Sequence, residues 1–373
     1  MTHILAGLLG IALLGLVLRD AFETIILPRR VNRRFRLTAL FYIVSWRVWR
    51  RAARPMQPRF RDNTLSWYGP MSLLVLIALW AFTIVLAFGI LHWSAGSALK
   101  MDSSRPNFGD DLYLSGTTFF TLGMGDVVPR VALAKVITVF EAGFGFAFLA
   151  IVIGYLPVIY QAFSRRELAI SLLDARAGSP PSAGELLWRH RDDEDHSDLV
   201  RLLSEWERWA AEVLESHLSY PVLAYFRSQH GNQSWLAALT TMLDTSALVM
   251  VGFDGWCERQ ANLTFAMARH AVVDLSQVFS ARQPSDAGDR LPAAELALLL
   301  DRLREGGMVL RSADAAEQLA ELRSMYEPYV TALANYLELP LPAWNHAAGK
   351  KDNWEGAPWK VRGISDHPEL PHF

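Results

Sequence analysis

The sequence lacks several features on which common functional classes depend. Its 373 residues contain one cysteine, Cys257, which excludes intrachain disulfides and cysteine-rich zinc sites. Only 20% of the residues are charged, below the usual ~25%. The formal net charge of −2 argues against a general nucleic-acid-binding protein, which would be strongly basic. P-loops and nucleophile elbows are absent, so we expect neither an enzyme nor a bound cofactor.

Apolar residues are abundant instead, at 51% of the chain with a mean hydropathy of +0.15. They concentrate in three runs near the N-terminus. The run 4–18 has no charge, 67–93 has none either, and 136–163 contains only Glu141. A helix needs about 20 apolar residues to cross the hydrocarbon core of a bilayer. The sequence therefore predicts a membrane protein with three spanning helices.

An alternative for the N-terminal run is a cleaved signal peptide. Its first residues, Met1-Thr2-His3, carry no lysine or arginine, and no small-x-small cleavage site follows. A spanning helix here has to continue past Arg19 towards Leu27. We expect a retained N-terminal transmembrane helix over 1–28.

The segment after the first run has arginine but no acidic residue. Eleven arginines lie between Arg29 and Arg61. The positive-inside rule places this segment in the cytoplasm, with the N-terminus outside and the C-terminal part inside. Arginines also alternate with apolar residues here, so we expect a basic amphipathic linker over 29–66. It is either a site of contact with anionic lipid or only a topology signal.

The loop between the second and third runs has an unusual composition. Residues 107–130 read NFGDDLYLSGTTFFTLGMGDVVPR, which is half apolar and then glycine-rich. Asn107, Asp110 and Asp111 suit the N-terminus of a helix. The apolar stretch 112–120 is too short to span a membrane. We therefore expect a re-entrant loop, in which a short helix returns as extended backbone along a protein-lined path.

The order of these residues resembles potassium channels. Thr121-Leu122-Gly123-Met124-Gly125-Asp126 resembles the signature T-V-G-Y-G-D, with Met124 in place of the usual aromatic residue. The whole chain looks like the bacterial group labelled two-pore-domain potassium channel family protein, although it has one pore loop. The resemblance implies a pore domain over 67–163, which comprises an outer helix 67–93, a pore loop 107–129 and an inner helix 131–163.

The resemblance also implies roles for individual residues. Backbone carbonyls of Thr121, Leu122, Gly123 and Met124 from four chains would replace the water around a dehydrated potassium ion. Asp126 would lie at the outer mouth of this selectivity filter. Thr117 and Thr118 would lie in the pore helix that precedes it.

The inner helix carries the candidate gate. Gly145 matches the hinge glycine of the family, and one helical face carries the gate residues Phe146, Leu149, Ile153 and Pro157. An apolar constriction there can gate by dewetting; the alternative is ordinary helix packing. Glu141 is expected to face protein, because facing lipid would cost ~2.5–3.5 kcal/mol or more. Filter support, with Thr117 or the filter backbone as partner, is one hypothesis, and a shallow aqueous crevice is the other.

After residue 163 the charges recur in helical rhythm. We expect a helical cytoplasmic domain over 164–340 and an irregular tail over 341–373, which makes the protein all-α. No motif indicates a regulatory ligand. The resemblance thus implies a homotetrameric potassium channel of a bacterial inner membrane, with potassium as the permeant ion. A non-selective cation channel and a non-conducting sensor or scaffold remain as alternatives.

Overall fold

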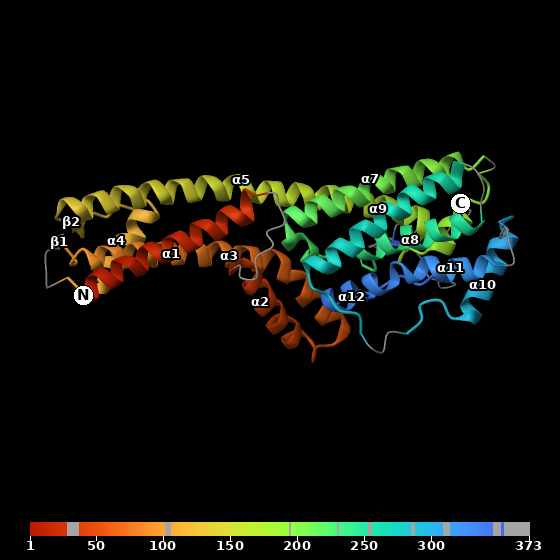
Figure 1. Cartoon of the computed structure of the whole chain (residues 1–373), viewed down its shortest axis with the longest axis horizontal. Coiled ribbons are helices and arrows are strands. Elements are labelled where there is room, and N and C mark those ends of the chain that lie inside the picture. Colours follow the sequence, from red (N-terminus) through yellow and green to blue (C-terminus); the bar gives the residue numbers. More distant parts are fainter. Residues whose placement is uncertain are drawn as a thin grey trace, which may run out of the picture. The chain divides into compact units, whose positions relative to one another are not determined.

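The computed structural model describes residues 1–27, 37–100, 106–193, 195–229, 231–252, 256–284, 288–308, 314–345 and 352–353. These residues confirm the predicted all-helical architecture (Figure 1). They form two compact units, Met1–Gln161 and Ala162–Phe373. Helix α5 begins in the first unit and ends in the second, since it runs from Ala132 to Ala177.

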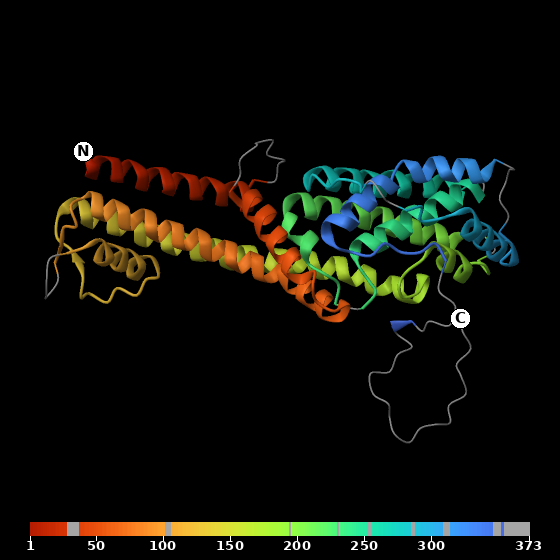
Figure 2. The same ribbon diagram turned by 90° about the horizontal axis from the view of Figure 1, so that it is seen from below.

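The first unit contains three long apolar helices that are suited to a membrane: α1 (Thr2–Ile25), α3 (Pro58–Ser94) and the first part of α5. Figure 1 and Figure 2 show them as long rods. A side chain at Gly10 of α1 would meet Leu91 of α3 at 2.9 Å, so the glycine allows these two helices to approach closely. Phe88 of α3 packs on Phe144 of α5 with ring centroids 5.8 Å apart.

Two of these helices are longer than the apolar runs predicted. Helix α3 begins at Pro58 rather than Trp67, and α5 ends at Ala177 rather than Phe163. Proline is favoured in the first turn of a helix because its missing N–H would have no partner there. The predicted runs are shorter than the helices because hydropathy identifies only the apolar part of a helix, and the charged residues that follow or precede this part can also be helical.

The linker forms a separate helix, α2 (Leu37–Ala53). Its buried face includes Trp46, which packs on Tyr68 of α3 with ring centroids 4.7 Å apart. The opposite face leaves large apolar side chains exposed, namely Leu40, Ile43, Val44 and Val48. Residues 28–36, with five of the eleven arginines, lie outside the described residues.

The loop between α3 and α5 contains α4 (Phe108–Phe119). Asn107 caps it by accepting a hydrogen bond from the Gly109 N–H at 2.7 Å, while the Asp110 carboxylate accepts from the Asn107 N–H at 2.8 Å. Two short strands, β1 (Leu99–Lys100) and β2 (Val128–Pro129), pair antiparallel and close the loop at its base. The sequence did not predict them, because two residues are too few to show alternation.

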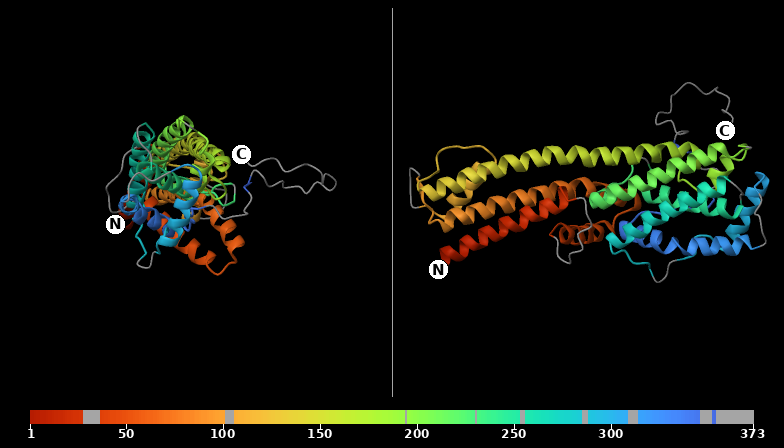
Figure 3. Two further views of the ribbon diagram at one scale, coloured as in Figure 1. Left: turned by 90° about the vertical axis from the view of Figure 1, so that its right-hand side faces the viewer. Right: turned by 45° about the horizontal axis from the view of Figure 1, so that its top comes forward.

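The second unit is a helical bundle built after α5. Its elements are α6 (Ala183–Arg189), α7 (Ser197–Ser219), the 3-10 helix η1 (Pro221–Tyr225), α8 (Trp235–Gly252), α9 (Trp256–Val278), α10 (Ala293–Glu305), α11 (Ala315–Ser324) and α12 (Glu327–Leu337). Figure 2 and Figure 3 show α7 beside α9, and the Thr264 hydroxyl of α9 donates to Leu203 O of α7 at 2.9 Å. Helix α8 is a fourth helix apolar enough to span a membrane, but 89% of it is buried inside this unit. It therefore forms the core of the bundle.

Candidate functional site

The end of α4 is bonded directly to the predicted filter. Thr117 O accepts hydrogen bonds from Leu122 N at 2.7 Å and Gly123 N at 3.3 Å. The Thr117 hydroxyl donates to Leu114 O at 3.0 Å. The backbone carbonyl of Thr117 therefore fixes where the chain turns out of the helix.

Left-handed backbone conformations alternate along this segment. Thr121 has φ 57°, Gly123 has φ 55° and Gly125 has φ 81°. Alternation of this kind lets successive peptide groups turn towards one side, and glycine adopts it without a steric penalty. Thr121 is β-branched and adopts it at a cost of about 1–3 kcal/mol. Glycine is therefore needed at 123 and 125, while the strain at Thr121 was not foreseen from the sequence.

The side chains of the segment point away from the rest of the single chain. Leu122 is 65% exposed and Met124 is 68% exposed. Asp126 accepts from the Val127 N–H at 3.0 Å, and its carboxylate also pairs with the Tyr113 hydroxyl of α4. The Tyr113 contact connects the far end of the segment back to α4.

Gly145, the predicted hinge, lies where α5 touches the end of α4. Helix α5 continues through it without interruption. A Cβ atom at Gly145 would lie 2.1 Å from Phe119 O, the carbonyl of the last residue of α4. Its missing side chain therefore allows α5 to contact the end of α4. Phe119 and Phe148 pack beside this contact with ring centroids 5.6 Å apart.

The predicted gate residues share an exposed face of α5. Phe146 is 70% exposed, Leu149 54% and Ile153 63%. Pro157 is also exposed, and the helix runs on through it. In the single chain this face thus has no covering partner among the described residues.

Glu141 is fully buried and joins three helices. Its carboxyl group contacts the Ser115 hydroxyl of α4 and lies 3.3 Å from His92 Nε2 of α3. The predicted orientation towards protein is therefore present, but the partners differ from the predicted Thr117. Spacing along α5 could not identify them, because they come from residues 26 and 49 positions away.

A second buried acid in the first unit was not predicted. Asp20 of α1 is 4% exposed and accepts hydrogen bonds from Thr38 N at 3.2 Å, Thr38 Oγ1 at 2.6 Å and Trp80 Nε1 at 3.0 Å. It therefore ties the start of α2 to α1 and α3. The sequence signal that could have identified Asp20 is the presence of an acidic residue inside an apolar run.

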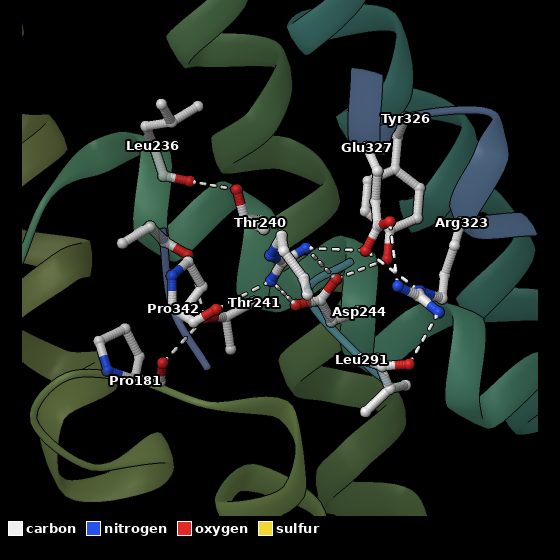
Figure 4. A network of polar contacts seen from close by, with 12 residues as sticks. Pro181, Leu236, Thr240, Thr241, Asp244, Leu291, Arg323, Tyr326, Glu327 and Pro342 are labelled. Carbon is white, nitrogen blue, oxygen red and sulfur yellow. Dashed lines mark hydrogen bonds and ion pairs between the residues drawn. The ribbon is translucent and has the colours of Figure 1, made fainter. Parts of the chain in front are cut away.

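The second unit encloses an ionic network, drawn in Figure 4. Asp244 of α8 is fully buried and accepts from Arg290 Nη2 at 2.6 Å and from the Tyr326 hydroxyl at 2.5 Å. Arg323 and Glu327 lie beside it and pair with each other at 3.1 Å. Burial and the Asp244 carboxylate raise the pKa of Tyr326 well above its usual value. The network joins α8 to the segments that carry Arg290 and Tyr326.

Arg166 of α5 connects this helix to the bundle. Its guanidinium donates to Leu223 O at 2.8 Å, Phe226 O at 2.6 Å and His217 Nε2 at 3.1 Å. His217 Nδ1 donates to Val213 O at 2.8 Å, and because Nε2 accepts from Arg166 it carries no hydrogen, so His217 is neutral. Burial and the Arg166 charge lower the pKa of His217 well below its usual value.

Comparisons with known proteins agree with a channel. Residues 72–161 match the family described as ion channel. The uncharacterized membrane protein YdjJ of Bacillus subtilis (strain 168) is 24% identical over 194 residues, which are 51% of this chain and 55% of that protein. The chain therefore matches about half the length of this relative. No solved structure matches the chain. Residues 72–161 are thus similar to an ion-channel family, and the chain is a membrane protein with several apolar helices.

Proposed function

We propose that the protein is a homotetrameric potassium channel that lets ions cross the membrane passively. The observation that carries this proposal is the path from α4 into residues 121–125. A capped half-helix holds Leu122 and Gly123 through Thr117 O, and left-handed residues alternate beyond it. Carbonyls of Thr121, Leu122, Gly123 and Met124 from four chains would replace the hydration shell of the ion.

Two exposed surfaces support assembly around a central axis. The segment at Leu122 and Met124 and the face of α5 at Phe146, Leu149 and Ile153 are both apolar and exposed in the single chain. Exposed contiguous apolar surface marks contact with lipid or with other chains. Three further copies would cover the first surface and make the second surface the wall of the inner pore.

The membrane setting follows from the arginines. We propose a bacterial inner membrane, with the N-terminus outside and the second unit in the cytoplasm. Helix α2 would lie in the inner leaflet, where Leu40, Ile43, Val44 and Val48 face the acyl chains. Arginines of the segment Arg29–Arg61, Arg47 and Arg51 among them, would contact anionic headgroups at about 1 kcal/mol each.

Potassium flux from liposomes that contain the purified full-length chain tests the proposal. Gly123→Ala places a Cβ on a left-handed residue, and we expect it to abolish flux. Gly143→Ala is the matched control, because a Cβ there meets nothing within 4 Å in the chain. Flux that survives Gly123→Ala would contradict a path through this segment. A native chain without flux would favour the sensor or scaffold alternative.

The gate proposal has its own test in bilayer recordings. Ile153 is an exposed apolar residue on the candidate pore face. Ile153→Ser would make a dewetted constriction easier to fill with water, so we expect a larger leak current in the closed state. An unchanged closed-state conductance would count against this face as the gate.

A further inference from the structure

Three buried ionisable side chains meet between the helices of the channel module. His92 of α3, Asp111 of α4 and Glu141 of α5 are each at most 1% exposed. His92 Nε2 lies 3.3 Å from Glu141 Oε2. His92 Nδ1 and Asp111 Oδ1 have no hydrogen-bond partner. Within the described residues no group of this kind is arranged to hold a metal ion, and the hydrogen bonds of the cluster depend on where its protons lie.

The direction of the Ser115 hydrogen bond depends on whether Glu141 carries a proton. The Ser115 hydroxyl has one hydrogen but two oxygens within reach, Val85 O of α3 at 2.7 Å and Glu141 Oε1 of α5. A backbone carbonyl can only accept. If Ser115 donates to Val85 O, its contact with Glu141 requires a hydrogen on the Glu141 carboxyl group. If Glu141 is ionised, Ser115 donates to Glu141 and Val85 O loses this donor.

This choice bears on the filter because of where Ser115 lies. It is two residues before Thr117, whose carbonyl holds the amides of Leu122 and Gly123. The bond from Ser115 to Val85 O ties this part of α4 to α3. The proton on Glu141 therefore bears on this hydrogen bond between α4 and α3.

We propose that Ser115, Glu141 and His92 form a proton-dependent brace that positions α4 and makes ion conduction depend on pH. In the complete brace, neutral Glu141 donates to Ser115, Ser115 donates to Val85 O, and His92 Nε2 donates to Glu141 Oε2. Raising the pH removes the Glu141 proton, and the hydrogen bond from Ser115 to Val85 O between α4 and α3 is then lost. The inference rests on the proposed channel function and adds regulation of the same filter.

The other ionisable groups nearby are few among the described residues. Asp111 of α4 accepts from the Ser97 hydroxyl at 2.5 Å, and Asp110 adds to the negative field at Asp111. His3 of α1 lies at the same end of α3, where its Nδ1 is 3.2 Å from Trp93 O. The pH midpoint of conduction would belong to the coupled cluster rather than to Glu141 alone.

Planar-bilayer recording of the full-length tetramer tests the brace. With equal potassium on both sides, the pH of both solutions is raised together from acidic to alkaline. We expect the open probability of the native channel to fall by about tenfold, which corresponds to about 1.4 kcal/mol of lost positioning. Glu141→Gln cannot ionise, and its amide can still donate to Ser115, so this variant should conduct at every pH with a flat profile.

Three further variants distinguish the loss of the brace from a general loss of folding or assembly. Ser115→Ala should hold the open probability at the low alkaline level at every pH. His92→Gln removes one coupled group, so the midpoint should shift. His3→Gln should keep the native profile, because His3 contacts Trp93 and not the cluster.

The opposite outcomes are distinct. A native current that does not change with pH overturns the brace alone. A Glu141→Gln channel that keeps the native pH profile also overturns it, and so does a Glu141→Gln variant that forms tetramers but does not conduct. A native chain that passes no current at any pH overturns the proposed function, and the brace with it.

Discussion

The two units of the chain satisfy their buried acids with different partners. In Met1–Gln161, Asp20 accepts from Thr38 and Trp80, which are neutral donors. In Ala162–Phe373, Asp244 is paired with Arg290. A cation inside a membrane is expensive and needs its own partners, and Asp20 of the first unit is accordingly held by neutral hydrogen-bond donors. The second unit buries a whole ion pair.

The units also differ in how they cover their apolar side chains. Helix α8 of the second unit is almost entirely buried by its neighbours. The α5 window in the first unit is only 11% buried. The second unit therefore has a complete core within one chain, whereas the first unit leaves most of the apolar part of α5 uncovered.

The largest expected effect is in the ionic core of the second unit. Asp244→Ala leaves the Arg290 guanidinium buried without its main partner, which should cost about 3–5 kcal/mol of stability. Asp301→Ala is the control, because its pair with Arg304 is 66% and 60% exposed, and such pairs contribute about 0–1 kcal/mol. Thermal unfolding of the purified protein measures both. Equal shifts in Tm for the two variants would show that the buried Asp244 contributes no more to stability than the exposed Asp301.

The next effect concerns packing in the first unit. Gly145→Ala drives a Cβ into Phe119 O, and overpacking of this kind costs about 1–3 kcal/mol. We expect α5 to move away from α4 and flux to fall at least tenfold, on the order of 1.4 kcal/mol. Gly143→Ala, with open space at its Cβ position, should conduct normally. Comparable flux from the two variants would show that the close contact is not required.

The smallest effect is a pH dependence of the second unit. His217 is held neutral because burial and Arg166 lower its pKa, whereas in the unfolded chain its pKa is about 6.5. The unfolded state then binds more protons below about pH 6.5, so stability is full above that pH and falls as the pH drops. His217→Gln should flatten the acid side of the Tm profile. His270→Gln, at a 60% exposed side chain, should leave it unchanged, and a flat native profile would contradict the assignment.

Much of the fold could be predicted because its signals are local. The three apolar runs correspond to α1, α3 and α5, and the Asn107 and Asp110 cap lies where the acidic cluster indicated. The glycines at 123 and 125 are also local signals, since their left-handed backbone favours that residue.

The remaining features depend on contacts between distant segments. Asp20 and Trp80 are 60 residues apart, and His92 and Glu141 are 49 apart. The reason for Gly145 is visible only once Phe119 O is placed against it. Helix ends were also missed, since α3 and α5 continue past the apolar runs that defined them.

Potassium selectivity through residues 121–125 is tested most directly by the reversal potential with potassium on one side of a bilayer and sodium on the other. A carbonyl-lined filter should give a reversal potential close to the potassium equilibrium value, and Gly123→Ala should abolish the current. A reversal potential near zero would contradict potassium selectivity and favour a non-selective cation channel. A complete absence of current from the native tetramer would contradict conduction itself.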